Sequence, residues 1–178
     1  MQNFYFSPGN TPWIFAKYFK NDVPNKSIKY IDKVIVFTKS NVADATFKLR
    51  LIKPNEEGEP GIDLVTEPII VHVKRGNKKN IIDLLQYNVK IPKEGVFIGF
   101  EWILSHNNRI KAFNFRKNEL IFSDYKYAPD LVCNMVEKSN AYRYVAGEWK
   151  KNETFINVKD ENESKPIIEP AINLILTN

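Results

Sequence analysis

The sequence of 178 residues has few of the residues that hold small secreted domains together or perform catalysis. It contains one cysteine, Cys133, so no disulfide can form within the chain. It contains two histidines, His72 and His106, and neither belongs to an HExxH motif. A zinc site needs three or more convergent ligands, and a chain of this length folds without disulfides or metals. We therefore expect no metal, no cofactor and a buried Cys133 that packs as a small apolar residue.

Long apolar runs are also missing. No run approaches the roughly 18 residues that a transmembrane helix requires. The N-terminus lacks the basic and apolar regions of a signal peptide. We expect no membrane insertion of this chain, and its abrupt, strand-like start predicts that it was excised from a longer protein.

Arginine is scarce among the cations that give the net charge of +5. Proteins that bind nucleic acids use arginine for bidentate contacts, whereas lysine dominates here and is scattered along the chain. The densest basic cluster consists of Lys74, Arg75, Lys78 and Lys79. We interpret it as a solvated turn and expect no nucleic-acid partner.

The strongest signal that is present is a doubly apolar strand from Val96 to Leu104. With a period of two, one face is entirely apolar, and the other is apolar apart from Gly99 and Glu101. A strand of this kind is usually central and covered on both sides. Residues Ala45 to Lys53 alternate between apolar and basic positions, which predicts a strand with one solvated face.

The rest of the chain contains roughly a dozen short strands, with turn signals about every ten residues. This pattern predicts an all-β fold, a jelly-roll-like antiparallel β-sandwich that forms a single domain over residues 1–178. Gly76-Asn77 predicts a β-hairpin between Ile69–Lys74 and Asn80–Leu84. Ser123 to Pro129 is predicted to be an exposed aromatic loop, and residues 159–165 a mobile loop.

An ordered set of segments resembles a known bacterial module. It comprises the strand pair Ile31–Phe37 and Phe47–Ile52, the loop Glu57–Val65, the strand Ile69–Lys74, the run Asp83–Ile103, the segment Tyr142–Lys151 and the ending Leu174–Asn178. Together they resemble the C-terminal β-sandwich module of bacterial carboxypeptidase-regulatory-like domain-containing surface proteins. The resemblance implies a jelly-roll-like sandwich that follows an upstream Ig-like domain, located in the periplasm or at the cell surface. It implies no peptidase activity and assigns no catalytic or ligand residues.

We therefore expect a non-catalytic accessory module with a structural or protein-interaction role, whose partner is a protein or a glycan at the cell surface. The alternative is a carbohydrate-binding module, because exposed aromatic rings stack on sugars. The candidate ligand-binding residues are Tyr125, Tyr127, Tyr142, Tyr144 and Trp149.

A third hypothesis is a glycosidase built on Glu101, because jelly rolls host such enzymes. No second strand-borne acid pairs convincingly with it, and we expect Glu101 either to face a lysine or arginine or to cap backbone groups at the edge of the buried part of the sheet. No nucleophile-elbow motif marks a catalytic serine, and no local signature activates Cys133. The acidic loop with Glu56, Glu57, Glu59 and Asp63 matches no EF-hand, and we interpret it as solvated rather than as a calcium site.

Overall fold

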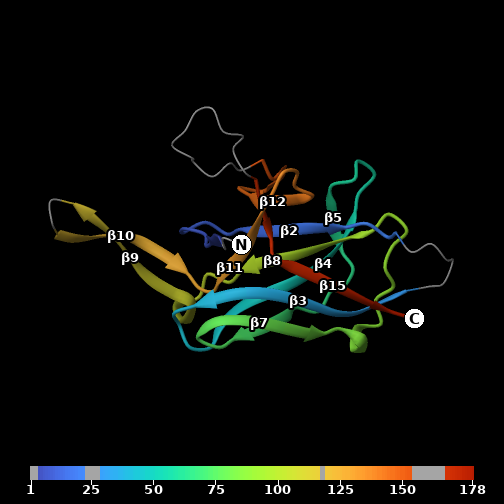
Figure 1. The fold of residues 1–178 in the computed structure, drawn as a ribbon, viewed down its shortest axis with the longest axis horizontal. Helices are drawn as coiled ribbons and strands as arrows, with labels where there is room; N and C mark the ends of the chain where they lie inside the picture. The colour runs from blue at the N-terminus through green and yellow to red at the C-terminus, as the bar shows by residue number, and fades with distance from the viewer. Residues whose placement is uncertain (1–3, 23–28, 117–118, 154–166) are drawn as a thin grey trace.

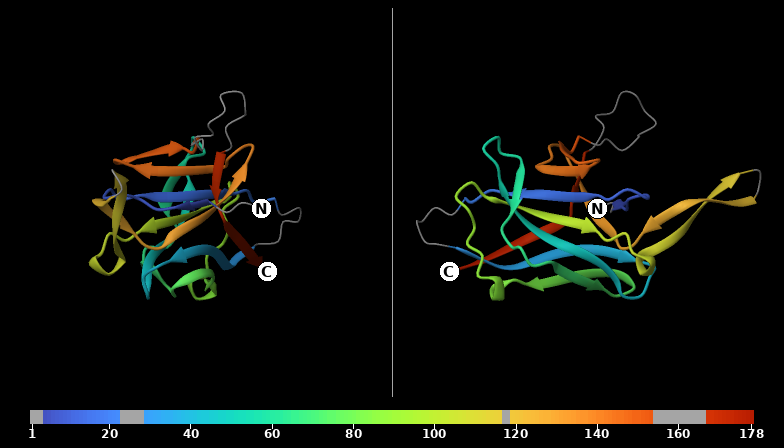
Figure 2. Two further views of the ribbon diagram at one scale, coloured as in Figure 1. Left: turned by 60° about the vertical axis from the view of Figure 1, so that its left-hand side comes forward. Right: turned by 180° about the vertical axis from the view of Figure 1, so that it is seen from behind.

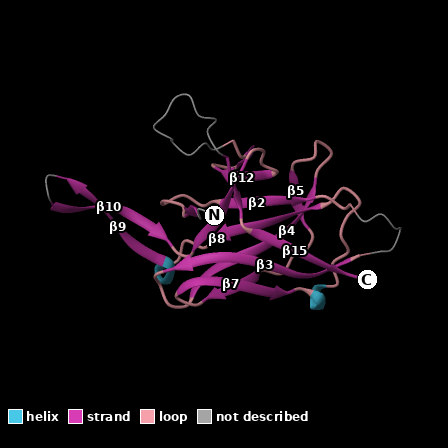
Figure 3. Cartoon of the chain, viewed as in Figure 1, coloured by secondary structure: helices cyan, strands magenta, loops and turns pink. Residues whose placement is uncertain are grey.

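Two antiparallel β-sheets and a projecting two-stranded ribbon make up the computed structural model (Figure 1). The structure describes residues 4–22, 29–116, 119–153 and 167–178. Strands dominate these ranges, and the helical elements are two short 3-10 turns, η1 (Leu85–Tyr87) and η2 (His106–Asn108) (Figure 3). The predicted all-β sandwich is confirmed. No helix in the described ranges is long and apolar enough to cross a membrane.

The first sheet is organised around its longest strand, β3. One edge of β3 pairs with β7, and the other pairs first with β15 and then with β11. Strands β1 and β14 extend the sheet by pairing with β11. The strands are β1 (Phe4–Phe6), β3 (Tyr30–Ser40), β7 (Gly76–Asp83), β11 (Asp130–Val136), β14 (Ile167–Pro170) and β15 (Ile172–Thr177).

The second sheet has β8 at its centre, between β2 and β4. Strands β12 and β13 continue it beyond β2, and both β5 and β6 pair with β4. The strands are β2 (Ile14–Phe19), β4 (Ala45–Pro54), β5 (Pro60–Asp63), β6 (Ile69–Val73), β8 (Val96–Trp102), β12 (Ala141–Val145) and β13 (Glu148–Lys151).

The inner face of β8 closes the main core, as the sequence predicts. Val96, Ile98, Phe100 and Trp102 are all buried there. The ring of Phe100 stacks on Phe47 of β4, with 4.1 Å between the ring centroids, and meets Trp102 edge to face. Aromatic pairs of this geometry add to the free energy gained from burying apolar area.

The outer face of β8 forms a second, smaller core. Phe97 is buried there with Ala16 of β2 and Ile52 of β4, and Tyr142 and Trp149 pack against them. The ring centroids of Phe97 and Tyr142 are 5.5 Å apart, although β2 lies between their strands. Neighbouring strands are about 4.8 Å apart, so the second sheet must curl until its edge covers its own outer face.

Two local predictions are wrong. Strands β6 and β7 do not form a hairpin, because β6 pairs with β4 and β7 pairs with β3. The chain crosses from one sheet to the other at Lys74-Arg75. The pairing of β6 and β7 is determined by the distant strands β4 and β3 and not by the turn between them. Ser123–Pro129 is not a loop, since β10 runs continuously from Glu119 to Tyr127. The predicted mobile loop at 159–165 lies outside the described residues.

Gly95 directly precedes β8, and a substitution at this position tests how closely the chain packs at the start of the strand. Its φ is +92°, and a Cβ atom there would collide with the carbonyl oxygen of Phe19 and lie 2.8 Å from the Tyr18 hydroxyl. Gly76 has nearly the same φ, +94°, but open space around it. We expect Gly95→Ala to lower the free energy of unfolding by about 3 kcal/mol, and Gly76→Ala by about 1 kcal/mol from backbone strain alone. Urea denaturation measures both, and equal losses would contradict the close packing at Gly95.

Candidate functional site

The two-stranded ribbon projects from one end of the sandwich (Figure 2). It consists of β9 (Arg109–Arg116) and β10 (Glu119–Tyr127), which pair with each other and with no other strand in the described residues. We call this ribbon the arm. Tyr125 and Tyr127, two of the five candidate ligand-binding residues, lie on β10 in its inner half, where both are half-buried.

A β-bulge at Ser123 gathers aromatic residues on one face of the arm. Phe122 pairs with Phe113 and Tyr125 pairs with Lys111, so Phe122 and Tyr125 share a face although they are three residues apart. In a regular strand this spacing would place them on opposite faces. The Ser123 hydroxyl donates to the carbonyl oxygen of Ala112 at 3.1 Å, which fixes the bulge.

The result is a continuous row of rings, which we call the aromatic ladder (Tyr125, Phe122 and Phe113). The Arg109 guanidinium lies over the Tyr125 ring, 4.4 Å from its centroid. The centroid of Tyr125 is 5.2 Å from that of Phe122, which is 6.1 Å from that of Phe113. The ladder therefore runs from the base of the arm towards its tip.

The outer part of the arm is unusually exposed for apolar side chains. Phe113 is 51% exposed, Phe122 47%, Ile121 47% and Leu120 70%. Single exposed apolar residues are common on protein surfaces, but a contiguous group marks an interaction site, and Phe113, Leu120 and Phe122 share one face of the arm. The body of the protein gains no burial from these residues.

The base of the arm, in contrast, is firmly anchored. The side chain of Asn108 is fully buried, and its amide nitrogen donates to the carbonyl oxygens of Thr46 and Ile103 at 2.7 and 2.8 Å. Its amide oxygen accepts from the backbone N–H of Thr46 at 2.9 Å. On the other side, the Trp102 indole donates to the carbonyl oxygen of Pro129 at 2.8 Å. Asn108 was not predicted, because in the sequence it is one polar residue within a turn.

The other three predicted residues lie far from the arm, on the curled edge of the second sheet. Tyr142, Tyr144 and Trp149 are all half-buried. Tyr144 packs against Trp149, with 5.1 Å between ring centroids, while Tyr142 meets Phe97. The structure thus separates the predicted set into two groups and uses the second group partly for packing.

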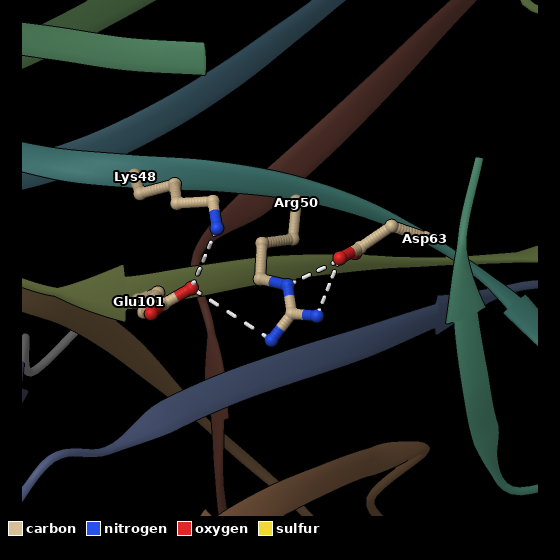
Figure 4. Close-up of polar contacts among 4 residues, drawn as sticks. All are labelled: Lys48, Arg50, Asp63 and Glu101. Carbon is tan, nitrogen blue, oxygen red and sulfur yellow. Dashed lines mark hydrogen bonds and ion pairs between the residues drawn. The ribbon is translucent and has the colours of Figure 1, made fainter. Parts of the chain in front are cut away.

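Beside this curled edge lies a group of charges on the outer face of β4, β5 and β8 (Figure 4). Arg50 donates from Nε to Asp63 at 2.9 Å and forms a second bond to the same carboxylate. One carboxylate oxygen of Glu101 lies 3.7 Å from Arg50 Nη1 and 3.5 Å from Lys48 Nζ. The prediction that Glu101 faces a lysine or arginine is confirmed. Asp63, assigned in the sequence to an acidic loop, is instead the acid that shares Arg50 with Glu101.

Comparisons of the chain with protein-family models, with curated proteins and with solved structures find no match. A function for the chain therefore has to be inferred from the arrangement of its own residues.

Three features of the described residues bear on the catalytic and metal chemistry that the sequence raised. Asp63 and Glu101, the two acids of the charge group, both lie beside cations. Burial, together with Glu169 nearby, raises the pKa of the Cys133 thiol to about 12, so the nucleophilic thiolate does not form near neutral pH. Within the described ranges no group of three His, Cys, Asp or Glu residues could hold a metal ion. The arm is the surface on which exposed Phe113, Leu120 and Phe122 gather on one face.

The anchor at Asn108 yields a prediction for stability. In Asn108→Ala, three backbone groups of Thr46 and Ile103 lose their partners in a buried site, and each such group costs about 1–3 kcal/mol. We expect the free energy of unfolding to fall by about 3 kcal/mol in urea denaturation. The control is Asn114→Ala, an exposed position on the arm, which should change it by less than about 0.5 kcal/mol. Similar losses in the two variants would contradict the assigned role of Asn108.

Proposed function

We propose that this chain is a non-catalytic interaction module that binds a partner protein through the aromatic ladder of the arm. The observation that supports it best is the exposure of Phe113, Leu120 and Phe122 on a ribbon that is anchored at its base and unsupported beyond it. Burying apolar surface against a partner is favourable by about 25 cal/mol for each Å² that is removed from water.

The chemistry of the ladder suits a protein partner. Interface energy is concentrated in a few aromatic residues and arginine, which are the residue types found here. Arg109 and Tyr125 at the base provide polar groups beside the apolar rings of Phe113 and Phe122. The partner is expected to present an apolar patch that accepts these two rings.

The resemblance to modules of bacterial surface proteins gives this proposal a setting. Such modules are accessory domains of longer chains, located in the periplasm or at the cell surface. An arm that projects from a stable sandwich would hold a partner at a fixed distance from the body. The carbohydrate-binding alternative at Tyr142, Tyr144 and Trp149 has less support, because Tyr142 and Trp149 pack against the second core.

Photo-crosslinking tests the proposal in cells that produce the full-length protein. A benzoylphenylalanine residue at position 120, where the wild-type leucine is 70% exposed, is expected to give one discrete adduct with another protein. The control position is Ile62 on β5, which is 74% exposed but lies in the body. No adduct at position 120, or equal adducts at both positions, would contradict the proposal.

The protein in the adduct is then identified by mass spectrometry, purified and titrated against this chain by calorimetry. We expect the double variant Phe113→Ser/Phe122→Ser to weaken binding at least thirtyfold, the effect of losing one hot spot of about 2 kcal/mol. Its free energy of unfolding should stay within about 1 kcal/mol of the wild type, because both rings are half exposed. Ile62→Ser should leave the affinity unchanged. An unchanged affinity in the double variant would refute the role of the ladder.

A further inference from the structure

An open hollow of about 420 Å³ lies on the outer face of the first sheet, on strands that the arm does not use. It forms where β3 changes its partner along one edge. Val36 is paired with Ile172 of β15, and Thr38 is already paired with Leu131 of β11. Between these pairs, Ala171 bridges the strands by accepting from the Phe37 N–H at 3.2 Å and donating to the Val132 carbonyl oxygen at 2.8 Å.

The floor of the hollow is apolar because of this junction. Phe37, Val132 and Ala171 line it, and the last two are each 8% exposed. Ala171 contributes only a methyl group at the point where three strands meet. A larger residue there would fill the space, so the hollow results from the strand exchange and one small side chain.

The walls of the hollow are polar, with a clear bias of charge. Three amides line it, from Asn77, Asn134 and Asn173, together with two exposed lysines, Lys78 and Lys79. Among the described residues that line it, none is Asp or Glu. The amides both donate and accept hydrogen bonds, and the lysines attract an anion.

An aromatic ring completes the rim. Tyr5 of β1 is 43% exposed, and the Lys39 ammonium lies 4.5 Å from its ring centroid. Lys39 has a counter-charge close by, because Asp130 is its register partner on β11. Lys79 is an exposed cation on the face that carries the floor of the hollow, because its register partner is Phe37. Lys78, one residue earlier on β7, alternates to the other face of the strand.

We propose that this hollow binds an acidic oligosaccharide, a glycan chain that contains uronic acid units. A sugar ring has apolar C–H faces that suit the Phe37 floor and the Tyr5 ring, and hydroxyl groups that suit the amides. The carboxylate of a uronate meets Lys79, which lies on the same face of the sheet as its register partner Phe37. The volume lies in the usual range for small-ligand sites, about 300–1,000 Å³, so it accommodates part of a chain rather than a polymer. This site is separate from the arm, and either proposal can fail without the other.

Calorimetry on the purified chain tests the site with uronate trisaccharides of the galacturonate, mannuronate and glucuronate types. Each is compared with its neutral counterpart. At least one acidic trisaccharide is expected to bind ten times more tightly than its neutral counterpart at low salt. The preference should shrink as the salt concentration rises, because the lysines are exposed. No preference for any acidic trisaccharide would overturn the proposal.

Two sets of variants locate the site. Lys78→Ala/Lys79→Ala should reduce the preference for the acidic sugar to about one, whereas Tyr5→Ala should weaken acidic and neutral sugars alike. The matched control is Lys150→Ala/Lys151→Ala, which removes the same charge from two exposed positions of β13. If the control variant lost the preference for the acidic sugar to the same extent, the binding would reflect attraction to the net charge of the protein instead of a site. That result would overturn the proposal. The arm variant Phe113→Ser/Phe122→Ser should bind the sugars like the wild type.

Discussion

Burial of both faces of β8 is the interaction on which the rest of the sandwich depends. The inner face places Phe100 against Phe47 in the main core, and each fully buried side chain of this size contributes about 1.5–3 kcal/mol. The outer face is also apolar at Phe97, so it needs a cover. The curl of the second sheet supplies one by bringing Tyr142 and Trp149 over the face of their own sheet.

The molecule divides into a body, which consists of the two sheets packed around β8, and the arm. The body buries most of its large apolar side chains in two cores that meet at β8. The arm is tied to that body by buried hydrogen bonds of Asn108 and Trp102, yet its outer rings are left in water. A rigid base with an exposed aromatic face is the arrangement expected of a binding element, and the acid-free hollow on the first sheet is a second surface of the same body.

The sequence predicts well those features that depend on local alternation. The strands at Ala45–Pro54 and Val96–Trp102 and their inward faces follow from a period of two. The partner of a strand depends on distant residues, so the Gly76-Asn77 turn wrongly suggested a hairpin. The bulge at Ser123 breaks the alternation that would have revealed the arm, and the pairing of Arg50 with Asp63 joins positions that only the fold brings together.

Amide hydrogen exchange tests the division into body and arm most directly. Amides of β8 are expected to exchange only through global unfolding, and their protection should fall in Gly95→Ala by the full loss of stability. Amides in the outer half of the arm should exchange through local opening, with lower protection that is unchanged in Gly95→Ala. If those arm amides instead matched β8 in protection and in their response to Gly95→Ala, the arm would belong to the cooperative core. The account of an independent binding element would then be wrong.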